Sequence, residues 1–104
     1  MDGIIGKWVQ AEGQPYAGLW FEFKADGSFS ARYDAMSIDS AGTYTLSGAQ
    51  IDMNQTSHTF GLVGHFKGIF EIEGDVLKLA LAGGAEQPRP INLGDARYYV
   101  KSKA

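Results

Sequence analysis

The chain has 104 residues, no cysteine, a net charge of −3 and 44% hydrophobic residues, which indicates one ordered domain over residues 1–104. The lack of cysteine excludes disulfides, zinc–thiolate sites and thiol catalysis, and the acidic balance argues against nucleic acid as a partner. No hydrophobic run approaches a membrane span and no signal peptide is visible, so a cytoplasmic location is expected if the chain is complete, and a periplasmic or secreted one if a leader has been removed.

Hydrophobic and polar residues alternate along most of the chain, with the period of two that is typical of β-strands. Helical periodicity is almost absent. Eight strands are predicted, in chain order: one around Trp8, then 19–24, 28–34, 43–46, 51–54, 66–73, 76–81 and 96–103.

Three connections have the length and the glycine positions that are typical of tight hairpins. They are residues 25–27, with Gly27 left-handed, and the two-residue loops 48–49 and 74–75. The registers that follow place hydrophobic residues opposite one another: Phe23 with Phe29, Leu46 with Ile51, and Ile72 with Leu77. The first hairpin also sets Trp20 opposite Arg32 on the outer face, as a candidate cation–π pair.

The other four connections are longer: residues 11–18, 34–41, 55–64 and 82–95. Long and tight connections alternate along the chain. In an up-and-down antiparallel array, this alternation places every tight turn at one end and every long loop at the other. Because pairing the first strand with the last removes both edges, the sequence predicts an all-β, eight-stranded antiparallel closed barrel. The first strand begins at the closed end.

The segment Gly6-Lys7-Trp8 resembles the G-x-W motif of lipocalins and the wider calycin superfamily. The second half, "GTYTLSGAQIDM" through "GIFEIEGDVLKL", is similar to small bacterial lipocalin-like domains of unknown function. The resemblance implies a calycin-like barrel, here without a C-terminal helix. It also implies that Trp8 plugs the closed end and that a basic residue of the last strand, Lys101 or secondarily Arg97, packs across it.

Ten residues are predicted to contact a ligand in the upper barrel, because binding residues concentrate on loops above a rigid scaffold and barrel mouths hold ligands. They are Tyr16, Tyr33, Met36, Tyr44, His58, Phe60, His65, Phe66, Arg89 and Tyr98. In the alternative, the long loops fold over and seal the barrel, and the tyrosine hydroxyls bond to one another or to backbone carbonyls.

The predicted interior is bulky, and an eight-stranded barrel is just wide enough to be filled by side chains or to hold one small ligand. The residues that leave space are Ala31, Gly42, Gly64 and Gly68. Any cavity is therefore expected to be shallow and open at the mouth.

No pattern of catalytic or metal-ligating residues stands out. His58 and His65 belong to no recognisable haem or metal motif, and the carboxylates are expected to be solvated and paired with lysines. We therefore expect neither an enzyme, nor a cofactor, nor a metal site. The leading hypothesis is a protein that binds a small apolar or amphipathic molecule at the open end of the barrel.

Protein–protein interaction is the alternative hypothesis, through an inhibitor-like calycin domain with a filled barrel. A homodimer through an outer sheet face is a related expectation. Trp20, Ile69 and Tyr99 are predicted to form an exposed apolar patch on such a face. Neither nucleic acid nor a membrane is expected as a partner.

Overall fold

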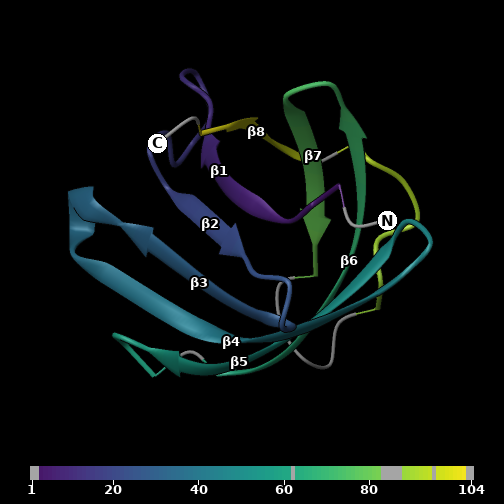
Figure 1. Cartoon of the computed structure of the whole chain (residues 1–104). Helices are drawn as coiled ribbons and strands as arrows, with labels where there is room; N and C mark the ends of the chain where they lie inside the picture. The colour runs from purple at the N-terminus through teal and green to yellow at the C-terminus, as the bar shows by residue number, and fades with distance from the viewer. Residues whose placement is uncertain (1–2, 62, 83–87, 95, 103–104) are drawn as a thin grey trace.

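The computed structural model describes residues 3–61, 63–82, 88–94 and 96–102. Its eight strands form the closed, antiparallel, up-and-down barrel that the sequence predicts, with β1 paired to both β2 and β8 (Figure 1). The strands are β1 (Gly6–Gln10), β2 (Trp20–Phe23), β3 (Ser28–Tyr33), β4 (Ile38–Ser47), β5 (Gln50–His58), β6 (Gly64–Glu73), β7 (Val76–Leu81) and β8 (Arg97–Lys101).

The helical content of the described ranges is one 3₁₀ turn, η1 (Asp34–Met36), between β3 and β4. None of the helices found in those ranges is long and apolar enough to cross a membrane. All the regular structure that positions a site is therefore sheet.

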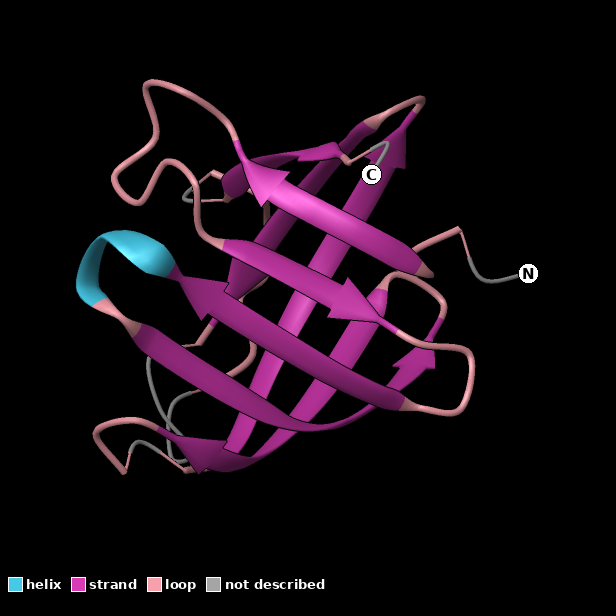
Figure 2. Cartoon of the chain, turned by 60° about the vertical axis from the view of Figure 1, so that its left-hand side comes forward, coloured by secondary structure: helices cyan, strands magenta, loops and turns pink. Residues whose placement is uncertain are grey.

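The tight hairpins have the registers that the sequence predicts: Phe23 pairs with Phe29, Leu46 with Ile51, and Ile72 with Leu77. The predicted long loops 34–41 and 55–64 are shorter than expected, because β4 already begins at residue 38 and β5 continues to residue 58. Figure 2 shows the tight turns on the right and the longer connections, including η1, on the left.

The hydrophobic core occupies the barrel interior, and its most deeply buried members lie toward the tight turns. Side chains that the alternation of β2, β3, β5 and β7 points inward meet there, and burial of such side chains is the main stabilising term of a barrel of this size. The largest fully buried side chains are Ile4, Trp8, Phe23, Ile51, Leu77 and Leu79.

The closed end is built on Trp8, which is 1% exposed and donates its indole N–H to the Ile4 carbonyl at 2.8 Å. Lys101 is the basic residue across it: its Nζ lies 4.8 Å from the centre of the Trp8 ring and donates to the Ile5 carbonyl at 2.8 Å. Gly6 has a φ of 131°, and a Cβ there would lie 2.8 Å from the Lys101 Nζ. These contacts agree with the predicted structural roles of Gly6, Trp8 and Lys101.

A β-bulge interrupts the pairing of β4 with β5. Gly42 pairs with Gln55 but Ala41 pairs with Ser57, so Thr56 is an extra residue on β5. The bulged backbone comes so close to Gly42 that a Cβ there would overlap the Asn54 carbonyl and lie 2.9 Å from the Gln55 Cα. Gly42 therefore permits the bulge, and it does not serve as the space-making residue that the sequence suggested.

We predict that Gly42→Ala destabilises the protein by at least about 2 kcal/mol, because the added methyl group pushes two backbones apart. Gly48→Ala is the matched control: Gly48 has a φ of 59° and open space around its Cα. It should cost only about 1 kcal/mol, from backbone strain alone. Urea unfolding of the two variants compares them, and equal losses would mean that the bulge relaxes around the methyl group.

Candidate functional site

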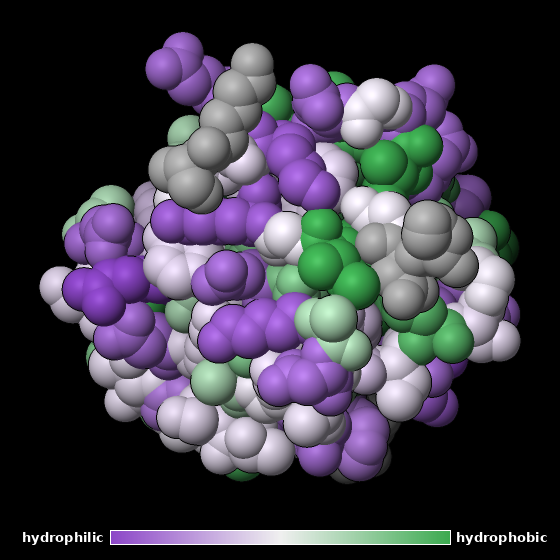
Figure 3. Space-filling model, in the orientation of Figure 1, coloured by the Kyte–Doolittle hydropathy of each residue, from purple (hydrophilic) through white to green (hydrophobic). Residues whose placement is uncertain are grey.

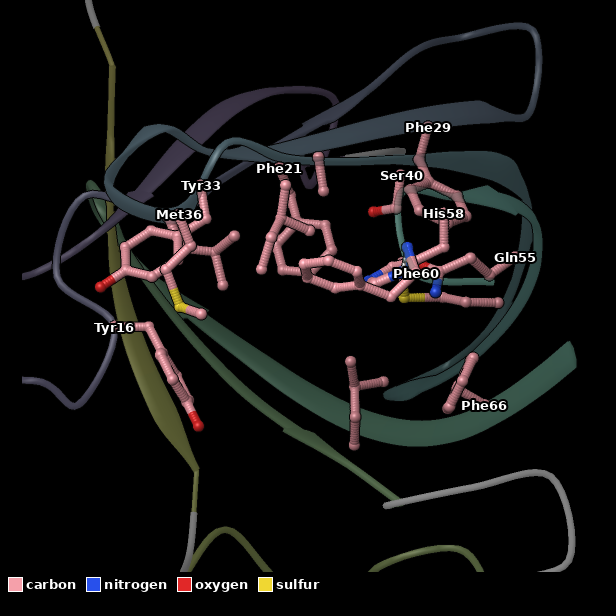
Figure 4. A pocket seen from close by; sticks show the side chains of 15 residues that line it. Tyr16, Phe21, Phe29, Tyr33, Met36, Ser40, Gln55, His58, Phe60 and Phe66 are labelled. Carbon is pink, nitrogen blue, oxygen red and sulfur yellow. Dashed lines mark hydrogen bonds between the residues drawn. The ribbon is translucent and has the colours of Figure 1, made fainter. Parts of the chain in front are cut away.

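The upper half of the barrel holds a cavity of about 510 Å³ with mostly apolar walls (Figure 4). It lies between the three described long connections and the hydrophobic core. Its lining residues are Tyr16, Leu19, Phe21, Phe29, Ala31, Tyr33, Met36, Ile38, Ser40, Met53, Gln55, His58, Phe60, Phe66 and Leu81.

Three large apolar side chains form the rim of this cavity, one from each connection: Tyr16 before β2, Met36 in η1 and Phe60 after β5. They are 47%, 57% and 70% exposed, respectively. The Tyr16 ring meets Tyr33 edge-to-face at 5.9 Å. Because these side chains remain exposed, the described parts of these three connections do not seal the barrel, in contrast to the alternative expectation that the long loops fold over it.

Six of the ten predicted ligand residues line the cavity: Tyr16, Tyr33, Met36, His58, Phe60 and Phe66. The structure adds polar wall residues that the sequence analysis missed. Ser40 could have been found by extending the inward face of Tyr44 back along β4, since alternate residues share a face. Gln55 lies in a stretch that was taken for a loop.

His58 enters the cavity because of the bulge. Inward residues of β5 are Ile51, Met53 and Gln55, and the extra residue Thr56 then turns His58 to the same side. The His58 Nδ1 accepts the Phe60 backbone N–H at 3.0 Å, which leaves the Nε2 side of the ring for the cavity. A plain alternation of period two would have turned His58 away.

Two predicted ligand residues serve the framework instead. Tyr44 is 8% exposed within the core, and its hydroxyl donates to the Lys24 carbonyl at 2.7 Å, near a tight turn. Arg89, in the described part of the connection between β7 and β8, donates to the carbonyls of Ile51 at 3.1 Å and Gly68 at 2.8 Å. Neither residue reaches the cavity.

Arg89 also pairs with the Asp52 carboxylate at 2.6 Å. Since Asp52 lies on the outer face of β5, Arg89 fastens residues 88–94 to the outside of β5 and β6, where they run beside these strands in Figure 1. The predicted loop residue Gln87, which precedes this segment, lies outside the described residues.

The other two predicted ligand residues, His65 and Tyr98, lie on the outer faces of their strands. His65 pairs with Asn54 on the outer face of β6, because its neighbour Phe66 points into the cavity. Tyr98 is 41% exposed, whereas Tyr99 is 3% exposed and points inward. Because Lys101 faces the interior at Trp8, residue 99 must share its face and residue 98 cannot.

The predicted apolar patch of Trp20, Ile69 and Tyr99 is therefore absent, since Tyr99 is buried. Trp20 does pair with Arg32 in register, but it is Lys7 whose Nζ lies over the Trp20 ring, at 4.2 Å. Arg32 bonds to two aspartates instead. On the face seen in Figure 3, hydrophilic residues predominate and hydrophobic ones form small separate patches.

The small residues that were predicted to leave space in the barrel have different roles. Ala31 lines the cavity, as expected. Gly68 instead allows close packing between strands: a Cβ there would lie 2.6 Å from both the Ala80 carbonyl oxygen and the Leu81 side chain. Gly64, with a φ of 134°, is not among the lining residues.

A second cavity of about 500 Å³ adjoins the first. The two share four wall residues: Tyr16, Leu19, Phe21 and Leu81. The remaining walls of the second cavity come from β1, β7 and β8: Gln10, Leu79, Arg97 and Tyr99.

Two buried polar side chains meet at this second cavity. Gln10 is 2% exposed, and its Nε2 donates to the Tyr99 hydroxyl at 3.2 Å. Burial raises the pKa of Tyr99 to about 12, against smaller opposing effects of Gln10 and of the Arg97 charge. The Tyr99 hydroxyl is therefore neutral, and able to donate a proton in a hydrogen bond, at any physiological pH.

The described residues contain no group of three histidine, aspartate or glutamate side chains placed to hold a metal ion. Comparisons with protein-family models, with curated proteins and with solved structures find no match to this chain. The function is therefore inferred from the residues that line the two adjoining cavities.

We predict that folding stability decreases between about pH 10 and pH 12 partly through Tyr99. The unfolded chain loses this proton near pH 10, whereas the folded protein keeps it to about pH 12, so raising the pH over this range stabilises the unfolded state relative to the folded one. The full contribution is at most about 3 kcal/mol. Urea unfolding at several pH values measures it.

Tyr99→Phe should flatten this decline, and Tyr98→Phe, which alters an exposed neighbour, should not. Absorbance of tyrosinate should likewise lose its latest-titrating component in Tyr99→Phe alone. Identical pH profiles for the two variants would contradict the burial of Tyr99.

Proposed function

We propose that this protein binds a small apolar or amphipathic molecule in the upper half of its barrel, as a lipocalin-like domain. The observation that carries the proposal is the cavity of about 510 Å³ beneath an exposed apolar rim. Its volume falls within the range of small-molecule sites, and its walls combine hydrophobic surface with a few polar groups, as such sites do.

The walls explain where affinity would come from. Each methylene group moved from water to an apolar site gains about 0.8 kcal/mol, and association costs about 4 kcal/mol or more. About ten buried carbons then give a dissociation constant of about 1 mM, and about fifteen are needed for the micromolar range. Ser40, Gln55 and His58 offer hydrogen bonds on one side of the cavity, as seen in Figure 4.

The alternative of a protein-interaction module depends on a filled barrel. The cavity favours binding of a small molecule over that alternative, because a barrel used only through its outer faces has no need of an unfilled upper half. Binding without chemical conversion is the simplest function of such a cavity, and we propose no reaction.

We predict that the protein binds the uncharged fluorescent probe N-phenyl-1-naphthylamine and that Ser40→Phe weakens this binding at least tenfold. The phenyl ring would occupy space that the wild-type cavity leaves open. Ser47→Phe is the matched control, since Ser47 lies on the same strand but is exposed beside a tight turn. Fluorescence titration measures the dissociation constants.

Circular dichroism and thermal unfolding establish that both variants keep the fold. Failure of the wild-type protein to bind this probe or any uncharged apolar compound would refute the proposed function. Equal affinity of the two variants would place the bound probe outside the cavity.

A further inference from the structure

The second cavity presents polar groups whose hydrogen-bonding directions can be assigned. The Gln10 Oε1 accepts the backbone N–H of Tyr16 at 2.7 Å. Because a backbone N–H can only donate, the side-chain oxygen must face Tyr16 and the amide nitrogen must face Tyr99. The orientation of the Gln10 amide is thereby fixed by the fold.

This orientation determines the role of the Tyr99 hydroxyl. Its oxygen accepts a hydrogen from the Gln10 Nε2 at 3.2 Å, so its own hydrogen must point elsewhere. Among the described residues no acceptor for that hydrogen is found, nor for the second hydrogen of the Gln10 amide. Both groups line the cavity and have a donor to offer there.

Arg97 adds a positive charge to the same wall. It is the first residue of β8 and pairs with Leu79, so it shares the inward face of Tyr99. Its charge acts on the Tyr99 hydroxyl. Its guanidinium makes no ion pair with any residue in the described part of the chain, in contrast to Arg32 and Arg89. Arg97 is an exposed residue at the start of β8, so its five N–H donors are open to solvent or to a bound group.

We propose that the second cavity binds the carboxylate of an amphipathic ligand through Gln10, Arg97 and Tyr99, while the apolar body of the ligand occupies the first cavity. The two cavities share Tyr16 and Leu19 in their walls, so one elongated molecule can enter both. This inference rests on the proposed function and adds to it the chemical class of the ligand: a monocarboxylate with an apolar body.

The donors select a carboxylate on chemical grounds. Every assigned polar group offers N–H or O–H, so a ligand head must accept hydrogen bonds, and Arg97 favours one that is negatively charged. A carboxylate has two oxygens with which to accept an arginine fork and a further donor. An amine head would face like charge, and a hydroxyl head would leave donors unused.

Three probes of the same chain length test the head group: decanoate, decanol and decylamine, titrated into the intact protein at neutral pH by calorimetry. We expect decanoate to bind about tenfold more tightly than decanol, and decylamine to bind most weakly. Decanol binding as tight as that of decanoate would refute the carboxylate site but leave the proposed function intact. Failure of all three would count against both.

Arg97→Gln should lower decanoate affinity about tenfold and leave decanol affinity unchanged. Arg32→Gln is the control, because Arg32 lies on the outer surface, and it should change neither. Tyr99→Phe should reduce the decanoate preference by a smaller factor. Loss of decanol and decanoate binding in equal measure in Arg97→Gln would mean a structural role for Arg97 and would overturn the inference.

Discussion

The contact of Lys101 with Trp8 is the constraint on which much of the interior depends. It joins the last strand to the first at the closed end, with the ammonium group held between the indole ring and the Ile5 carbonyl. Because strand residues alternate between faces, fixing Lys101 inward also turns Tyr99 and Arg97 inward. The contact that closes the floor therefore determines which polar groups of β8 face the cavities, some distance above it.

The bulge at Gly42 has a corresponding effect on the opposite wall. If Thr56 were paired regularly instead of bulged, β5 would keep a single alternation and His58 would face solvent. With it, Gln55 and His58 share the cavity with Ser40 of β4. Such a bulge requires a residue without a side chain on the facing strand, since the Asn54 carbonyl occupies the place of a Cβ.

Features that depend on a few neighbouring residues could be predicted from the sequence, and some features that depend on strand pairing were missed. Turn chemistry and hydrophobic alternation predicted the hairpin registers, because both are local properties of a few residues. The bulge was missed because the run from Gln55 to His58 is polar throughout and carries no alternation to interrupt. Tyr98 was assigned to the wrong face although Lys101 was assigned correctly, and applying the alternation between these two positions would have revealed the error.

Arg89 is a different case, since its position depends on how a long connection packs against the outer face of the barrel. No local pattern encodes the two carbonyls and the carboxylate that it reaches on β5 and β6. An arginine in a loop near a barrel mouth was a reasonable ligand residue by type. Only the tertiary structure distinguishes it from Arg97, whose guanidinium has no such partners among the described residues and which lines the second cavity.

The two cavities also divide the sources of affinity and selectivity. Apolar walls favour the binding of any molecule with hydrophobic surface, because burying that surface is favourable and not directional. They therefore supply binding energy with little discrimination between ligands. Selectivity arises where a mismatched head would leave buried groups unpaired, and Gln10 and Tyr99 are buried donors of this kind. Their directions are set by one backbone N–H, that of Tyr16, whose side chain forms part of the rim. The β1–β2 connection therefore both orients these donors and forms part of the mouth.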